Sequence, residues 1–86
     1  MKKTKTIVYS TSWCSFCHSL MHWLDQLGID YEDIDVEADA DAREDMLRRT
    51  EGRFVVPVTI IGDETIIGFD RPAIKATLRK QTPSNG

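Results

Sequence analysis

The sequence WCSFCH at residues 13–18 holds both cysteines of the chain, separated by two residues. An apolar run at residues 7–9 precedes it, which favours a short buried strand. After it, apolar side chains recur at helical spacing and predict a helix over residues 15–27. We expect Ser12 to cap this helix and Gly28 to end it in a left-handed turn. The two thiols are therefore predicted where a strand ends and a helix begins.

Size and composition indicate one small soluble domain. The chain has 86 residues, of which 41% are hydrophobic and 29% charged, with a formal net charge of −3. There is no basic stripe of the kind that favours nucleic acid, and no apolar segment long enough for a membrane span or a secretion signal. We therefore expect a cytoplasmic protein without nucleic-acid or membrane partners. In the cytoplasm a close cysteine pair favours redox chemistry or metal binding over a permanent disulfide.

The middle of the chain predicts a strand followed by a helix. Residues 29–36 alternate apolar and acidic side chains with one slip at Asp33, and a half-buried strand is the best interpretation. Asp39 or Asp41 is placed to cap a second helix that runs through Arg49. This second strand should pair in parallel with the first through a right-handed crossover.

The last third of the chain predicts a hairpin and a helix. Residues 58–61 and 65–67 are strand-like runs joined by a tight Gly-Asp turn. Asp70 is expected to cap a final helix over residues 71–80, and residues 81–86 to form a flexible tail. The order β-α-β-α-β-β-α predicts an α/β three-layer sandwich with a four-stranded mixed sheet, in one domain over residues 1–80.

The two cysteines are predicted to play different chemical roles. At a helix N-terminus, unpaired backbone N–H groups and the helix dipole favour the thiolate of Cys14. Cys17 lies one turn further on the same helical face and is expected to be more buried. Because disulfide exchange requires a thiolate, Cys14 should attack a disulfide, and Cys17 should then attack Cys14 and release the reduced product.

A metal-binding module is the alternative from another functional class. Zinc requires two further ligands, and His18 and His22 both follow in the helix that carries Cys17. The C-x-x-C-H pattern also matches the attachment signature of c-type haem, but a strand precedes it and no export signal is evident. The sequence favours dithiol redox chemistry and predicts no metal site.

Three separated motifs carry a resemblance to a known family. They are Tyr9-Ser10 shortly before the C-x-x-C motif, Val56-Pro57 before the hairpin, and Gly68-Phe69-Asp70 at the start of the last helix. In this order the chain resembles the small glutaredoxin-type proteins of the thioredoxin fold. The resemblance implies a thiol–disulfide oxidoreductase and electron carrier that reduces protein disulfides, or mixed disulfides with a small thiol, without a tightly bound cofactor.

The resemblance also implies roles for residues at the active site. Cys14 matches the nucleophile and Cys17 the resolving cysteine. Pro57 matches a cis-proline that faces the site and would leave the backbone of Val56 free to pair with a peptide such as glutathione. Phe16 takes the place of the aromatic residue common between the cysteines.

Further positions match the residues that bind a small thiol in this family. Gly68, Phe69 and Asp70 match the segment that holds the γ-glutamyl end of glutathione, with helix N-terminal amides suited to its carboxylate and Asp70 to its ammonium group. Arg53 falls where a glutamine often contacts the glycyl carboxylate, and an arginine could do so bidentately. Trp13 is expected to be exposed and to face the substrate.

The electron donor stays open among three candidates. The single glycine at Gly68 resembles the redoxins that serve ribonucleotide reductase and are reduced by thioredoxin reductase. Trp13 and His18 resemble mycothiol-dependent relatives, the mycoredoxins, whereas glutathione serves the glutaredoxins proper. We expect a monomer that acts on disulfide-containing proteins. Some relatives instead bridge an iron–sulfur cluster with the first cysteine of each subunit, which is a further form of the metal-binding alternative.

Overall fold

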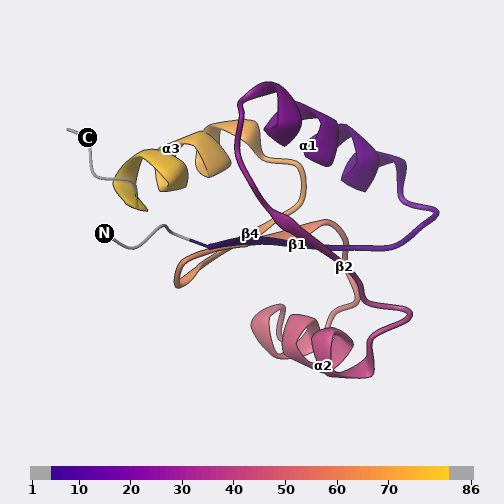
Figure 1. Cartoon of the computed structure of the whole chain (residues 1–86). Coiled ribbons are helices and arrows are strands. Elements are labelled where there is room, and N and C mark those ends of the chain that lie inside the picture. The colour runs from indigo at the N-terminus through magenta and orange to yellow at the C-terminus, as the bar shows by residue number, and fades with distance from the viewer. Residues whose placement is uncertain (1–4, 82–86) are drawn as a thin grey trace.

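The computed structural model describes residues 5–81 and arranges them in three layers. Figure 1 shows α1 and α3 on one face of the sheet and α2 on the other. The elements are β1 (Thr6–Ser10), α1 (Ser15–Gln26), β2 (Glu32–Asp35), α2 (Ala40–Arg49), β3 (Val58–Ile61), β4 (Glu64–Ile67) and α3 (Arg71–Gln81). Their order and the fold class are those predicted from the sequence.

The sheet topology brings three strand ends to one edge. The strand order is β2-β1-β3-β4, with β1 and β2 parallel and the other pairs antiparallel. Tyr9, near the end of β1, lies opposite Ile34 in β2 and opposite Val58 at the start of β3. The loop that follows β1, the loop that follows β2 and the segment that enters β3 therefore meet at the same edge.

Two hydrophobic clusters fill the spaces above and below the sheet. Along β1, Val8 and Tyr9 point to opposite faces, as the pleat of a strand requires. β3 is buried along its whole length because helices cover both faces of the sheet. The cluster toward α1 and α3 contains Val8, Leu20, Leu24, Ile61, Ile66 and Ile74. The cluster toward α2 contains Tyr9, Val36, Ala42, Met46, Val58 and Ile60.

The bounds of several elements differ from the predicted ones. β2 begins at Glu32, because the chain after α1 first closes a turn in which the N–H of Ile29 donates to the carbonyl of Leu24 over 3.0 Å. Gly28 adopts a φ of +73° in this turn, as predicted. The predicted tail begins inside α3 at Gln81, and its residues 82–86 lie outside the described part of the chain.

The predicted caps of α2 and α3 are present. The carboxylate of Asp39 accepts the N–H of Ala42 over 3.0 Å, and that of Asp70 accepts the N–H of Ala73 over 3.2 Å. These bonds satisfy amide groups that have no partner within the first turn of a helix. Over residues 5–81, no helix has the length and apolar character that crossing a membrane would demand.

Candidate active site

The helix that carries the cysteines begins on Cys14 itself. Cys14 has extended backbone dihedrals (φ −88°, ψ 108°), and its Sγ accepts the N–H of Cys17 over 3.1 Å. The prediction that Ser12 caps this helix is wrong. A turn in which the N–H of Cys14 donates to the carbonyl of Thr11 (3.3 Å) comes first and moves the helix start beyond Ser12. The Cys14 sulfur therefore takes the place of the cap and lies against the positive end of the helix dipole.

The two sulfurs differ in access to solvent. Cys14 is 6% exposed and borders a surface groove, whereas Cys17 is completely buried one turn further along α1. Both cysteines are free thiols in the structure. The backbone N–H of Cys17 points at the sulfur of Cys14, so the two residues are in direct contact.

The pKa of the Cys17 thiol is raised to about 12. Burial is the largest cause, followed by the hydrogen bond with Cys14, and the charges of Cys14 and Asp33 add to it. A backbone hydrogen bond with Thr11 acts in the opposite direction. This raised pKa favours the protonated thiol of Cys17 at neutral pH.

This raised pKa predicts a loss of stability at alkaline pH. Below about pH 9, the ordinary value of the Cys17 thiol, folded and unfolded chains both hold the proton. Above it the unfolded chain ionises and the folded chain does not, so the free energy of unfolding should fall by up to about 1.4 kcal/mol per pH unit. Urea unfolding of the reduced protein at several pH values measures this slope.

The matched control for this slope is Cys17→Ala, which lacks the titrating group. Tyr9 also has a pKa raised to about 12, through burial and its hydrogen bond to Asp45, from an ordinary value of 10.0. The pKa of Tyr31 is likewise raised by burial from 10.0. Both tyrosines contribute equally to wild type and to Cys17→Ala, so the difference between the two slopes from about pH 9 to 10 reports Cys17. Parallel loss of stability in wild type and variant would contradict the assignment to Cys17.

A groove of about 380 Å³ opens beside Cys14, and aromatic rings dominate its walls. Trp13 is 64% exposed, Phe16 66% and Phe54 44%, unusually high values for side chains of this size. The lining residues are Trp13, Cys14, Ser15, Phe16, Phe54, Val55 and Val56. Phe54 and Val55 were not predicted as site residues, and the signal that could have found them is an aromatic–aliphatic run directly before Pro57.

The structure brings the two distant motifs of the sequence to the same edge. The Val56–Pro57 peptide bond is cis, as the resemblance implied. The N–H of Gly68 donates to the carbonyl of Pro57 over 2.9 Å, which joins the loop before α3 to the segment that enters β3. Gly68 has a φ of +87°, a conformation that suits glycine because it carries no Cβ.

The other predicted binding residues lie outside the lining of the groove. The ring of Phe69 packs against Trp23, with ring centroids 6.0 Å apart, and the guanidinium of Arg71 lies 5.4 Å from the Phe69 ring. Asp70 caps α3, and Arg53 is exposed with its Nε donating to the carbonyl of Thr50 over 3.4 Å. Within residues 5–81, no three metal-ligating side chains gather at one place.

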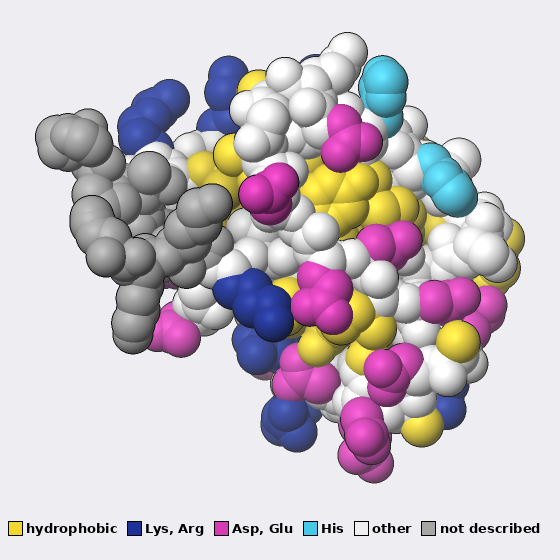
Figure 2. Space-filling model, in the orientation of Figure 1, with side chains coloured by type: hydrophobic (Ala, Val, Ile, Leu, Met, Phe, Trp, Pro, Cys, Tyr) yellow, Lys and Arg dark blue, Asp and Glu magenta, His cyan; other side chains and the backbone are white. Residues whose placement is uncertain are grey.

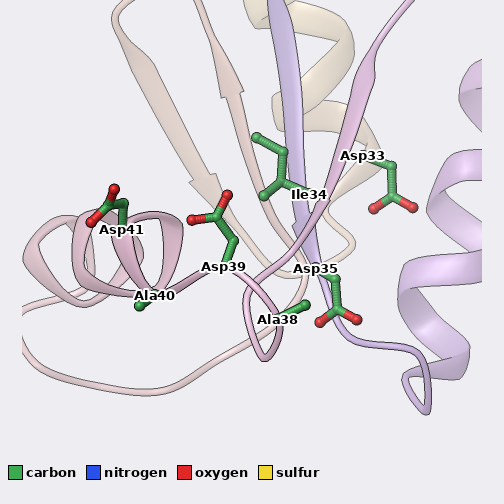
Figure 3. Close-up of a pocket in the computed structure, with 7 residues that line it drawn as sticks. All are labelled: Asp33, Ile34, Asp35, Ala38, Asp39, Ala40 and Asp41. Atoms are coloured by element: carbon green, nitrogen blue, oxygen red, sulfur yellow. The ribbon is translucent and has the colours of Figure 1, made fainter.

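An acidic segment borders the same edge of the sheet. A hollow of about 560 Å³ is lined by Asp33, Ile34, Asp35, Ala38, Asp39, Ala40 and Asp41. Figure 3 shows Asp33 on the side of β2 that faces α1, with Ile34 and Asp39 on the other side. The hydroxyl of Ser10 donates to Asp33, and the indole N–H of Trp13 donates to Glu37 over 2.9 Å. The cysteine loop is therefore tied to the loop that follows β2.

Comparison with known proteins shows that most of the chain is similar to redox proteins. The glutaredoxin family model matches residues 6–66, which include Cys14, Cys17 and Pro57. A glutaredoxin of Ricinus communis is 32% identical over 92 residues, covering 96% of this chain and 90% of that protein. Mycoredoxin 1 of Corynebacterium glutamicum is 38% identical over 58 residues, covering 67% of this chain and 71% of that protein. The structure of NrdH-redoxin from Escherichia coli matches with a TM-score of 0.73 and 29% identity, covering 84% of this chain and 92% of that chain.

Proposed function

The chain belongs to the glutaredoxin family, whose members are thiol–disulfide oxidoreductases, and we propose that Cys14 is its nucleophile and Cys17 its resolving thiol. One observation carries the assignment. The Cys14 sulfur caps α1 beside the groove and accepts the N–H of Cys17, which is itself buried. The cap position stabilises a thiolate, and burial keeps the second thiol protonated until the first has reacted.

The reaction that follows from this arrangement has two exchange steps. The Cys14 thiolate attacks one sulfur of the substrate disulfide, a bond forms between Cys14 and that sulfur, and the other substrate sulfur leaves as a thiolate that takes up a proton. Cys17 then loses its proton and attacks Cys14. The bond to the substrate breaks, the second substrate thiol is released, and a disulfide joins Cys14 to Cys17. Two electrons have passed from the protein to the substrate.

The substrate-binding surface is proposed on the groove and the two motifs beside it. Trp13 and Phe16 would contact the chain that flanks the substrate disulfide, and the backbone of Val56 next to Pro57 would pair with it in strand fashion. A small thiol such as glutathione would use a second set of residues, namely Arg53, Gly68, Phe69 and Asp70. In this set the N–H groups at the start of α3 suit a carboxylate.

Two reducing systems distinguish the electron donors. The oxidised protein is offered NADPH with thioredoxin reductase, and separately NADPH with glutathione and glutathione reductase, each with a peptide disulfide as substrate. We expect protein-dependent oxidation of NADPH in at least one system, because the family activity requires that the Cys14–Cys17 disulfide be reduced again. Oxidation of NADPH at the rate of the protein-free blank in both systems would exclude these two donors and leave mycothiol as the remaining candidate. Failure of the dithiothreitol-reduced protein to reduce the peptide disulfide would contradict the proposed function.

A further inference from the structure

Trp13 lies between an apolar surface and an acidic one. On one side it lines the apolar groove beside Cys14. On the other its indole N–H donates to the carboxylate of Glu37, an exposed residue in the loop between β2 and α2. A chain segment seated on Trp13 with its sulfur at Cys14 would therefore lie next to the charge of Glu37.

The segment around Glu37 is rich in carboxylates, and the guanidinium of Arg43 lies against it, donating to the carbonyl of Val36 over 3.1 Å. Residues 33–41 contain five carboxylates and no basic residue. Figure 2 shows Asp and Glu side chains gathered over the face that carries β2 and the start of α2, with hydrophobic side chains among them. The carboxylates of Asp33, Asp35 and Asp39 also accept hydrogen bonds within the protein, and these bonds hold the negative charges in place.

Building on the proposed function, we propose that the preferred substrate is a disulfide in a protein segment that carries an apolar side chain and basic residues beside its cysteine. The exposed rings of Trp13, Phe16 and Phe54 supply the aromatic contacts that anchor a protein partner at the centre of an interface. The carboxylates along residues 33–41 attract a basic segment and repel an anionic one. The alternative ligand is a small anionic thiol, which the carboxylates would repel and which would not fill the groove.

Two peptide disulfides test this specificity. Both contain a Phe-Cys core, and they differ only in having Lys or Glu on either side of it. The value of kcat/KM is measured for each with dithiothreitol as the reductant of the protein, and the rates with dithiothreitol alone are subtracted. At low ionic strength, the ratio of kcat/KM for the Lys peptide to kcat/KM for the Glu peptide should be about tenfold larger than the ratio of their rates with dithiothreitol alone. About 0.5 M salt should largely remove this preference.

Charge-matched variants locate the source of the preference. Glu37→Gln keeps an oxygen that can accept the Trp13 hydrogen bond but loses the charge, and should reduce the preference two- to threefold, as should Asp41→Asn. The control is Asp63→Asn, which removes the same charge from the β3–β4 turn at the opposite end of the sheet. This control should leave the preference unchanged.

Two results overturn the inference while the proposed function stands. In the first, the wild type reduces both peptides through Cys14 with no preference beyond that of dithiothreitol, or favours the Glu peptide. In the second, Asp63→Asn lowers the preference as much as Glu37→Gln does, so that net charge alone explains it. Reduction of neither peptide would instead contradict the proposed function itself.

Discussion

Replacement of Cys14 by Ser should abolish disulfide reduction, lowering the turnover rate at least about a thousandfold. The serine hydroxyl is far less nucleophilic than a thiolate. The remaining thiol cannot take over, because Cys17 is completely buried and its pKa is raised to about 12. The measurement is protein-dependent NADPH oxidation with a peptide disulfide, in whichever reducing system supports the wild type.

The Cys14→Ser variant should keep its fold, which makes the loss of activity interpretable. A serine side chain at the N-cap accepts a backbone N–H as the sulfur does here, so α1 retains its first turn. Equal thermal unfolding midpoints of variant and wild type check this. Ser19→Ala, at an exposed position of α1 outside the groove, is the control and should keep wild-type turnover. Activity of Cys14→Ser above a tenth of the wild-type rate would refute the assignment.

Replacement of Cys17 by Ser should stop the reaction after its first step. Cys14 still attacks the substrate, so one thiol per protein molecule is released in a burst. The mixed disulfide then accumulates because no internal thiol resolves it. Steady turnover on a peptide disulfide should fall at least about a hundredfold, while the amplitude of the burst stays close to one equivalent.

The buried position of Cys17 calls for a second variant. A serine hydroxyl there needs a hydrogen-bond partner that a thiol does not, at a cost of about 1–3 kcal/mol if none is found. Cys17→Ala avoids this cost and should give the same burst. An excess of a small thiol should restore turnover in both variants, since an external thiol can release the substrate from Cys14. Unimpaired turnover without added thiol would show that Cys17 is not the resolving residue.

The fold could be predicted from local patterns because they agree with the tertiary structure. The apolar spacing before Gly28 predicted α1, and the run before the Gly-Asp turn predicted β3 with its observed bounds. The cap of α1 could not be predicted in this way. Serine is a preferred cap residue in general, but here the turn at Thr11 decides where the helix begins, and Cys14 takes that place.

Only those residues of the candidate site that lie in recognisable sequence motifs could be predicted. The C-x-x-C spacing located Cys14 and Cys17, and the resemblance pointed to Pro57, which the structure places in hydrogen-bond contact with Gly68. The place of Phe54 in the wall of the groove was not predicted, because whether an aromatic ring is exposed depends on what packs around it. The contact between Trp13 and Glu37 was missed as well, since it joins residues 24 positions apart through the parallel pairing of β1 and β2.

The most direct test of the account compares the two single cysteine variants side by side. Each reduced variant is exposed briefly to the same peptide disulfide at neutral pH, and the protein mass is recorded. We predict that Cys17→Ser gains the mass of one peptide and that Cys14→Ser gains none, because only Cys14 combines a helix N-terminus with access to the groove. A peptide adduct on Cys14→Ser formed as fast as on Cys17→Ser, or no adduct on either variant, would contradict the claim that Cys14 is the nucleophile.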